Sequence, residues 1–109
     1  MIELKNTKVL VTGASSMIGR AVINKLEERG ANIVKIFHEE CDLLSWPQTI
    51  KIFNTHKTDY CIHAAGYNGN IRFNNLYPSD IFYNTTIMGL NVLKACALTG
   101  VKKVVTPLA

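Results

Sequence analysis

Residues 9–19 read VLVTGASSMIG, an apolar run followed by small residues and then by the start of a segment with helical periodicity. This order is typical of a β-strand that turns sharply into an α-helix. Gly13 permits the sharp turn, and Gly19 allows the helix to pack close to the strand. The pattern predicts a strand, a tight turn and a helix that begins near Met17.

The predicted turn has the features of a phosphate-binding site. Backbone amides at a helix N-terminus lack intrahelical acceptors, and the helix dipole favours an anion there. We therefore predict that the amides of Ser16, Met17 and Ile18 bind the pyrophosphate of a dinucleotide. The spacing is Gly-x-x-Ser-x-x-Gly, so Ser16 stands where a glycine would allow the closest approach of a ligand. An ordinary turn of small residues without a ligand is the alternative.

Apolar runs alternate with segments of helical spacing along the chain. The runs predict strands at 8–11, 33–37, 60–63 and 103–106, and the segments between them predict helices at 17–29, at 45–56 and from Pro78 to a stop at Gly100. Ser45 and Gln48 form a capping-box pattern at the start of the second helix. The predicted apolar stripes are Ile18, Ala21, Val22 and Leu26 in the first helix, and Ile81, Thr85, Met88, Val92 and Cys96 in the third.

Strands that are nearly unbroken apolar runs, each followed by a helix, indicate a parallel sheet covered on both faces. We predict an α/β fold, a Rossmann-like doubly wound parallel sheet with the element order β-α-β-α-β-α-β. The predicted spatial order of the strands is 3-2-1-4, and the sheet is expected to be incomplete. A ligand would then bind between the first and fourth strands, beside the residues that follow Val11 and Thr106.

Composition excludes several classes of function. The 109 residues allow one domain or part of one, and 48% hydrophobic residues suffice for a core. The net charge is +4, but the basic residues are scattered, so we expect no nucleic-acid partner. The sequence has neither a stretch that would span a bilayer nor a signal peptide, so we expect a cytoplasmic protein with no membrane partner.

The residues that often bind metals or form disulfides have no typical spacing. The three cysteines contain no C-x-x-C pair, and we predict buried, reduced thiols at Cys41, Cys61 and Cys96. The three histidines have no ligand spacing, so we predict no metal at His38, His56 or His63.

A second group of small residues follows the third predicted strand, where residues 61–66 read CIHAAG. Small residues allow the backbone to approach a ribose or a phosphate, and we predict cofactor contacts at Ala64, Ala65 and Gly66. Both small-residue segments follow strands of a parallel sheet. They are therefore expected to share its carboxyl edge.

Two other segments have both a functional and a structural interpretation. Asp42 and Leu43, after the second strand, can contact an adenine ring by hydrogen bonding, or they can form a solvent-exposed turn. The asparagines between residues 68 and 75 can overhang the ligand site, or they can be good turn formers.

Together these segments resemble a known family. The sequences VTGA at 11–14, DL at 42–43 and HAAG at 63–66, with the long third helix, are similar to the N-terminal half of extended short-chain dehydrogenases/reductases, the NAD-dependent epimerase/dehydratase family. Residues 69–83, GNIRFNNLYPSDIFY, resemble the GDP-L-fucose synthase branch, which has Gly-Gly-Ile and Asn-x-Tyr-Pro-(small)-Asp there. The resemblance covers essentially the whole chain. It implies that 1–109 is the N-terminal portion of an NAD(P)-binding Rossmann domain.

The resemblance also implies NADP or NAD as cofactor, and a parent enzyme that epimerises and reduces a GDP-4-keto-6-deoxy sugar. The family reduces its substrate with a Ser or Thr after the fourth strand, a Tyr that donates a proton, and a Lys in a Tyr-x-x-x-Lys motif. None of the 4 tyrosines here begins such a motif, and Ala109 aligns about one residue before the family's Ser or Thr. We predict no catalytic residue in this chain, and no activity of the chain alone.

Three positions depart from the branch. It tends to hold the 2′-phosphate of NADP with arginines in the glycine turn and after the second strand, where Ser15 and His38 stand here. We predict cofactor contacts at both residues and leave the choice between NADP and NAD open. An asparagine of the family's long helix falls at Thr85, next to Asn84.

Two hypotheses of function follow. The chain is the cofactor-binding portion of a nucleotide-sugar epimerase/reductase, or it is a non-catalytic dinucleotide-binding module or sensor. A domain with no ligand is a third possibility. Sequence beyond Ala109 would separate the first two. We also expect a homo-oligomer, because Val104 and Val105 of the fourth strand would lie at an uncovered sheet edge.

Overall fold

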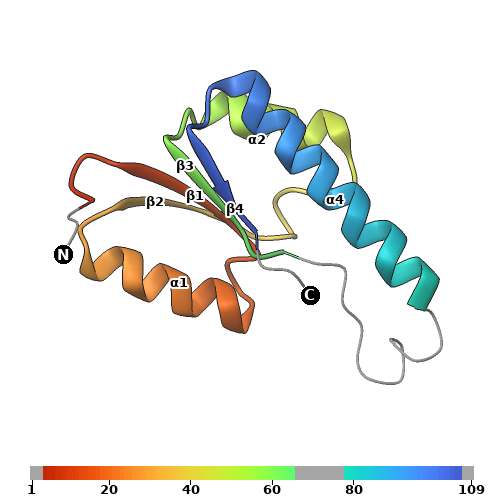
Figure 1. Cartoon of the computed structure of the whole chain (residues 1–109), viewed down its shortest axis with the longest axis horizontal. Helices are drawn as coiled ribbons and strands as arrows, with labels where there is room; N and C mark the ends of the chain where they lie inside the picture. The colour runs from red at the N-terminus through yellow and green to blue at the C-terminus, as the bar shows by residue number, and fades with distance from the viewer. Residues whose placement is uncertain (1–3, 66–77, 107–109) are drawn as a thin grey trace.

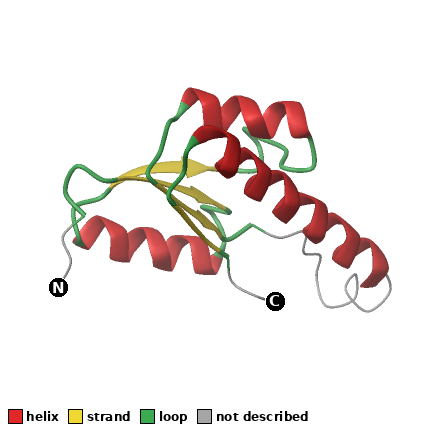
Figure 2. Ribbon diagram, turned by 45° about the horizontal axis from the view of Figure 1, so that its top comes forward, coloured by secondary structure: helices red, strands yellow, loops and turns green. Residues whose placement is uncertain are grey.

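The computed structural model describes residues 4–65 and 78–106, which form three layers. A parallel sheet lies between one helix on one face and two helices on the other (Figures 1 and 2). The predicted alternation of strands and helices is confirmed, with ends shifted by a residue or two. In chain order the elements are β1 (Lys8–Thr12), α1 (Met17–Glu28), β2 (Asn32–Ile36), α2 (Trp46–Thr55), β3 (Tyr60–His63), α4 (Pro78–Thr99) and β4 (Lys103–Val105).

The spatial order of the strands is β2-β1-β3-β4, so the predicted order 3-2-1-4 is wrong. β1 is central: Leu10 pairs with Val34 of β2 on one side and with Cys61 of β3 on the other. Given this order, right-handed crossovers place the helices on opposite faces, because the helix changes face when the chain changes direction across the sheet. α1 covers one face on the way from β1 to β2, and α2 covers the other on the way back to β3 (Figure 1).

The core lies on both faces of the sheet, because side chains of a strand alternate between its faces. Leu10 of β1 packs in a buried cluster with Phe53 of α2 and Val92 of α4. Val9 and Val11, its neighbours in β1, pack on the opposite face with Ile23 of α1. This double burial explains why β1 is an unbroken apolar run in the sequence.

The apolar stripe of α1 differs from its prediction. Ile18 is 48% exposed and Ala21 is also exposed, whereas Gly19 and Ile23 are the buried residues of the helix. Val22 and Leu26 are half-buried, and Leu26 packs against the cluster of Val9, Val11 and Ile23, so half of the predicted stripe is confirmed. Hydropathy alone gives no weight to a glycine, which is why the stripe included Ile18 and Ala21 in place of Gly19 and Ile23.

In α4 the later part of the predicted stripe is confirmed: Val92 and Cys96 are buried, and Met88 packs against the same cluster. Ile81 and Thr85, earlier in the stripe, are half-buried and lie outside that cluster.

The three cysteines are buried and form no disulfide, as predicted. Within the described residues, no helix combines the length and the apolar character that crossing a bilayer requires.

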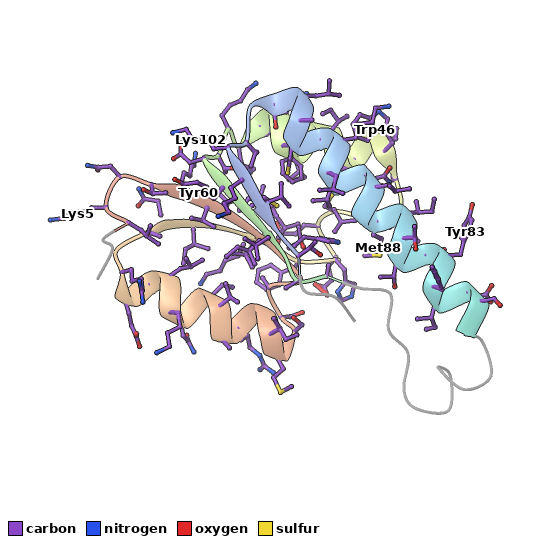
Figure 3. The ribbon with its side chains drawn as sticks, viewed as in Figure 1. Lys5, Trp46, Tyr60, Tyr83, Met88 and Lys102 are labelled. Atoms are coloured by element: carbon purple, nitrogen blue, oxygen red, sulfur yellow. The ribbon has the colours of Figure 1, made fainter. Side chains whose placement is uncertain are left out.

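The outer face of α4 is also apolar. Its exposed side chains include Phe82, Tyr83, Leu90 and Leu93, and Figure 3 shows Tyr83 pointing away from the body of the protein. β4 pairs only with β3 among the described strands, and Val105 is 50% exposed. Exposed apolar patches of this kind mark sites of association.

We expect the chain to self-associate through these apolar surfaces. Sedimentation velocity over a range of protein concentrations should show a mass above the monomer that falls on dilution. The substitutions Leu90→Lys and Leu93→Lys together should weaken association, because they place charges on the outer face of α4. Asn54→Lys, at an exposed position of α2, is the matched control and should leave association unchanged. A compact monomer at every concentration would contradict the prediction.

Candidate nucleotide-binding site

The strand order reverses at β1, since β2 lies on one side of it and β3 on the other. The loops that leave β1 and β3 diverge there, and ligands of doubly wound sheets bind at such a point. The predicted crevice between the first and fourth strands is therefore wrong, because β3 separates them. A cavity of about 670 Å³ opens at the carboxyl ends of β1, β2 and β3. The cavity is lined by eight of the residues for which the sequence predicts cofactor contacts or a role in the glycine turn: Gly13, Ser15, Ser16, His38, Asp42, Leu43, Ala64 and Ala65.

Gly13 is required by the turn after β1 for two independent reasons. Its φ of +64° lies in the left-handed region, which strains residues with a side chain. A Cβ atom at Gly13 would also lie 2.6 Å from the backbone nitrogen of Ala65, in the loop after β3. The glycine thus lets the two loops at the reversal point come into direct backbone contact.

Ser16 holds the rest of the turn. Its hydroxyl donates to the Gly13 carbonyl at 2.7 Å and accepts from the Gly19 amide at 3.0 Å, as the N-cap of α1. The Ser16 amide also donates to the Gly13 carbonyl, at 3.0 Å, so it is already engaged within the turn. A Cβ at Gly19 would overlap that same carbonyl oxygen. The serine in place of a middle glycine therefore serves as a cap that fixes the loop.

The amides of Met17 and Ile18 begin α1 and have no acceptor among the described residues. The first turn of α1 contains no acidic side chain, so no carboxylate of the helix itself competes for its positive end. The side chains of Met17 and Ile18 are exposed and do not line the cavity. Any contact of these two residues with an anion would therefore be made by the backbone.

Thr12 and His63 join the carboxyl ends of β1 and β3. The Thr12 hydroxyl lies 2.7 Å from Nδ1 of His63 and accepts from the Ala65 amide at 3.2 Å. Burial lowers the pKa of His63, which favours the neutral imidazole. When the neutral ring carries its proton on Nε2, its Nδ1 accepts a hydrogen bond from the Thr12 hydroxyl. The contact therefore positions the β3 loop against the turn after β1.

Three side-chain hydrogen bonds fix the segment after β2. The Gln48 side chain accepts from the Asp42 amide at 2.9 Å, Asp42 accepts from the Leu44 amide at 3.0 Å, and Asn91 of α4 donates to the Leu43 carbonyl at 2.8 Å. These bonds hold the Asp42–Leu43 wall of the cavity in place. Asp42 is exposed, as the interpretation of a solvent-exposed turn expects, but Leu43 is buried and both residues line the cavity.

The capping box at α2 is confirmed in one half and wrong in the other. Ser45 accepts from the Gln48 amide at 3.3 Å, as predicted. The Gln48 side chain, however, bonds to Asp42 rather than to the Ser45 amide, which donates to the Asp42 carbonyl. The capping glutamine is thereby used to shape the cavity.

The apolar walls of the cavity include Phe37, Cys41 and Met88, which the sequence analysis did not select as site residues. Burial, and then the charges of Asp42 and Glu40, raise the pKa of the Cys41 thiol, so the cavity wall there is neutral. Asn91 was also missed. The sequence feature that could have identified Asn91 is a polar amide side chain directly before the buried Val92, on an otherwise apolar side of the helix.

His38 stands at the open side of the cavity, two residues beyond the end of β2. Its Nε2 lies 2.9 Å from a carboxylate oxygen of Glu39, and both side chains are largely exposed. Ser15 lines the same cavity from the turn after β1. The two positions at which the family branch has arginines thus border one cavity.

Two predicted site elements cannot be placed. Gly66 and the asparagines between residues 68 and 75 lie outside the described residues. Gly19 is described but buried beneath the turn, where it supports the site without lining it.

The parallel sheet, the glycine turn between β1 and α1 and the cavity at the reversal point define an α/β protein of the Rossmann type. The chain belongs to the NAD dependent epimerase/dehydratase family, whose model matches residues 9–107.

Its relatives include enzymes that act on GDP-sugars. Putative GDP-L-fucose synthase 2 of Arabidopsis thaliana is 36% identical over 104 residues, which cover 94% of this chain and 31% of the relative. A GDP-L-fucose synthetase from Naegleria fowleri, solved with NADP bound, matches with 27% identity and a TM-score of 0.80 over 98% of this chain and 32% of that one. The GDP-mannoheptose C4 reductase MlghC from Campylobacter jejuni, also with NADP bound, has 25% identity and a TM-score of 0.86 over 97% and 31%. This chain spans about a third of each.

The buried imidazole makes a prediction about stability and pH. Because the folded pKa of His63 is below the ordinary value of 6.5, the unfolded chain binds a proton first as the pH falls. The free energy of unfolding should therefore fall as the pH is lowered through that value, until the lower folded pKa is reached. His63→Asn, which retains an acceptor near the Nδ1 position, should lose this component of the pH dependence.

Urea unfolding from about pH 8 to about pH 5 measures the effect. His56→Asn is the matched control for loss of an imidazole, and it should retain the acid sensitivity because His63 is still present. Equal slopes of unfolding free energy against pH in the wild type and in His63→Asn would contradict the assignment.

Proposed function

We propose that the cavity at the β1–β3 reversal binds a dinucleotide cofactor, NADP or NAD. The observation that carries the proposal is the left-handed Gly13 turn, because Gly13, Ser15 and Ser16 line a cavity that is partly open to solvent, and the two amides that follow Ser16 have no acceptor among the described residues. The volume of about 670 Å³ is within the range of roughly 300–1,000 Å³ common for ligand pockets. The residues present therefore fit such a cofactor.

The parts of the cofactor would be held by different elements. The amides of Met17 and Ile18 would bind the pyrophosphate, because they combine free donors with the positive end of the α1 dipole. Asp42 and Leu43 would hold the adenine, since the Asp42 carboxylate uses one oxygen within its own turn and has a second one left to accept. The small residues Ala64 and Ala65 would let the β3 loop approach the sugar and phosphate backbone.

We infer that the parent activity is that of an NAD(P)-dependent nucleotide-sugar epimerase/reductase, with a GDP-4-keto-6-deoxy sugar as substrate. The GDP-L-fucose synthases and GDP-sugar reductases among the relatives support this inference. The bound cofactor would supply the hydride for reduction of a keto group. This chain would bind and orient the cofactor, and a Tyr-x-x-x-Lys pair would have to come from elsewhere.

A non-catalytic dinucleotide-binding module is the second candidate. It would use the same Gly13 turn and cavity to bind the cofactor, without a catalytic Tyr-x-x-x-Lys pair. The gene sequence that follows codon 109 separates the candidates, because a downstream motif at that spacing would identify the enzyme.

Titration calorimetry with NADH and NADPH tests cofactor binding. The wild-type chain should bind at least one of them at millimolar concentration. Gly13→Val should abolish binding, because the side chain is strained at positive φ and overlaps the backbone of Ala65. Gly100→Val is the matched control: Gly100 also has a positive φ, of +79°, but a Cβ there meets nothing within 4 Å. It should lower stability by about 1–3 kcal/mol and leave binding intact. If neither nucleotide binds to the folded wild type, the proposal is wrong.

A kinetic assay tests the absence of catalysis. The chain, supplied with NADPH and a GDP-4-keto-6-deoxy sugar, should not consume NADPH above background, because general-acid assistance worth roughly 10²–10⁴-fold is missing. A complete GDP-L-fucose synthase in the same assay is the positive control. Steady turnover by the purified chain would show that it contains its own proton donor.

A further inference from the structure

We propose that the open side of the cavity, bordered by Ser15 and His38, selects the cofactor that lacks a 2′-phosphate, so that NAD(H) binds more tightly than NADP(H). This inference rests on the proposed dinucleotide site and names its preferred occupant. It differs from what the relatives solved with NADP bound would suggest.

The position of the ribose follows from the fold. With the pyrophosphate at the start of α1 and the adenine against Asp42 and Leu43, the adenosine ribose lies between the turn after β1 and the segment after β2. In dinucleotide-binding folds, the residues after the second strand contact the 2′-position of that ribose. Here Phe37 and His38 line the cavity after β2, and Ser15 borders the same volume from the opposite loop. Glu39 reaches the site through its contact with His38.

The charges at this position do not suit a phosphate. Among the described residues that line the cavity there is neither a lysine nor an arginine. The one group that can become cationic, His38, lies 2.9 Å from the Glu39 carboxylate. Asp42, which lines the cavity, adds further negative charge, as does Glu40. After burial, both help to raise the pKa of the Cys41 thiol in the cavity wall.

A 2′-hydroxyl and a 2′-phosphate make different demands on these groups. A hydroxyl needs one or two neutral partners, which the Ser15 hydroxyl and the His38 ring can provide. A phosphate brings close to two negative charges, and it is bound tightly where arginines form charge-assisted, bidentate hydrogen bonds with it. At this site the 2′-phosphate would lie near the Glu39 carboxylate, which is already paired with His38, the one imidazole among the described lining residues. The chemistry therefore favours the unphosphorylated ribose.

Titration calorimetry of the folded 109-residue chain with NADH and NADPH, at equal ionic strength, measures the preference directly. We expect the Kd for NADH to be lower by about tenfold or more. Glu39→Gln should improve NADPH binding severalfold with little change for NADH, because it removes a negative charge and retains the shape of the side chain. Because the Glu39 side chain is largely exposed, Glu39→Gln should fold normally, and it tests the proposal even if a variant with two substitutions fails to fold.

A double variant tests the same idea by gain of function. Ser15→Arg with His38→Arg places two cations at the 2′-position and should reverse the preference in favour of NADPH. Asn54→Arg adds the same kind of charge on the exposed surface of α2, outside the cavity, and should leave the ratio of the two Kd values unchanged.

The outcomes separate this inference from the proposed function. If the wild type binds NADPH as tightly as NADH, or more tightly, the cofactor preference is overturned while the dinucleotide site stands. If the folded chain binds neither nucleotide, both proposals fall. An unchanged ratio in Glu39→Gln and in the double arginine variant would show that Ser15, His38 and Glu39 do not contact the 2′-position.

Discussion

The backbone contact between the turn after β1 and the loop after β3 is the constraint on which the site depends. Gly13 adopts a left-handed conformation and leaves room only for a hydrogen at its Cα, because the Ala65 backbone occupies the place of a side chain. This contact is possible only because β1 and β3 are neighbours in the sheet. Gly13, Ala64 and Ala65 all line the cavity, so the contact forms part of its wall. A larger residue at Gly13 would separate these two loops and disturb the cavity in which the cofactor is proposed to bind.

Side-chain hydrogen bonds convert this contact into a rigid site. Thr12 links both strand ends through His63 and Ala65, and Ser16 ties the turn to the first residues of α1. On the other side of the cavity, Asn91 of α4 holds the carbonyl of Leu43. Each of these polar groups replaces water with a protein partner, so burial costs it little. A site whose loops are already ordered loses less conformational entropy when a ligand binds, which favours affinity.

The electrostatics of the site differ between its two ends. At the start of α1, free amides and the helix dipole attract an anion without any basic side chain. After β2, the exposed His38 ring lies 2.9 Å from a carboxylate oxygen of Glu39, and in the proposed complex this negative charge would disfavour a phosphate. In the proposed complex, the cavity would hold the bridging phosphates of a dinucleotide and discriminate against an additional phosphate on its ribose. The backbone of the fold would supply the first property, and the side chains that follow β2 would supply the second.

The sequence by itself determined the class of fold, the elements, and most of the candidate cavity residues. Alternating apolar runs and helical periodicity indicate which segments are strands and helices. The glycine turn of residues 9–19 could be predicted because its geometry depends on residues close together in the sequence. Strand order and helix facing were decided only by the tertiary structure. Hydropathy does not encode which neighbour a doubly buried strand chooses, so β3 was placed beside the wrong strand and the cavity between the wrong pair. Asn91 acts through a contact with Leu43, 48 positions away in the sequence. Gln48 accepts from the Asp42 amide rather than from the nearer Ser45 amide. Both hydrogen bonds form only when the layers pack together, so the sequence alone does not reveal them.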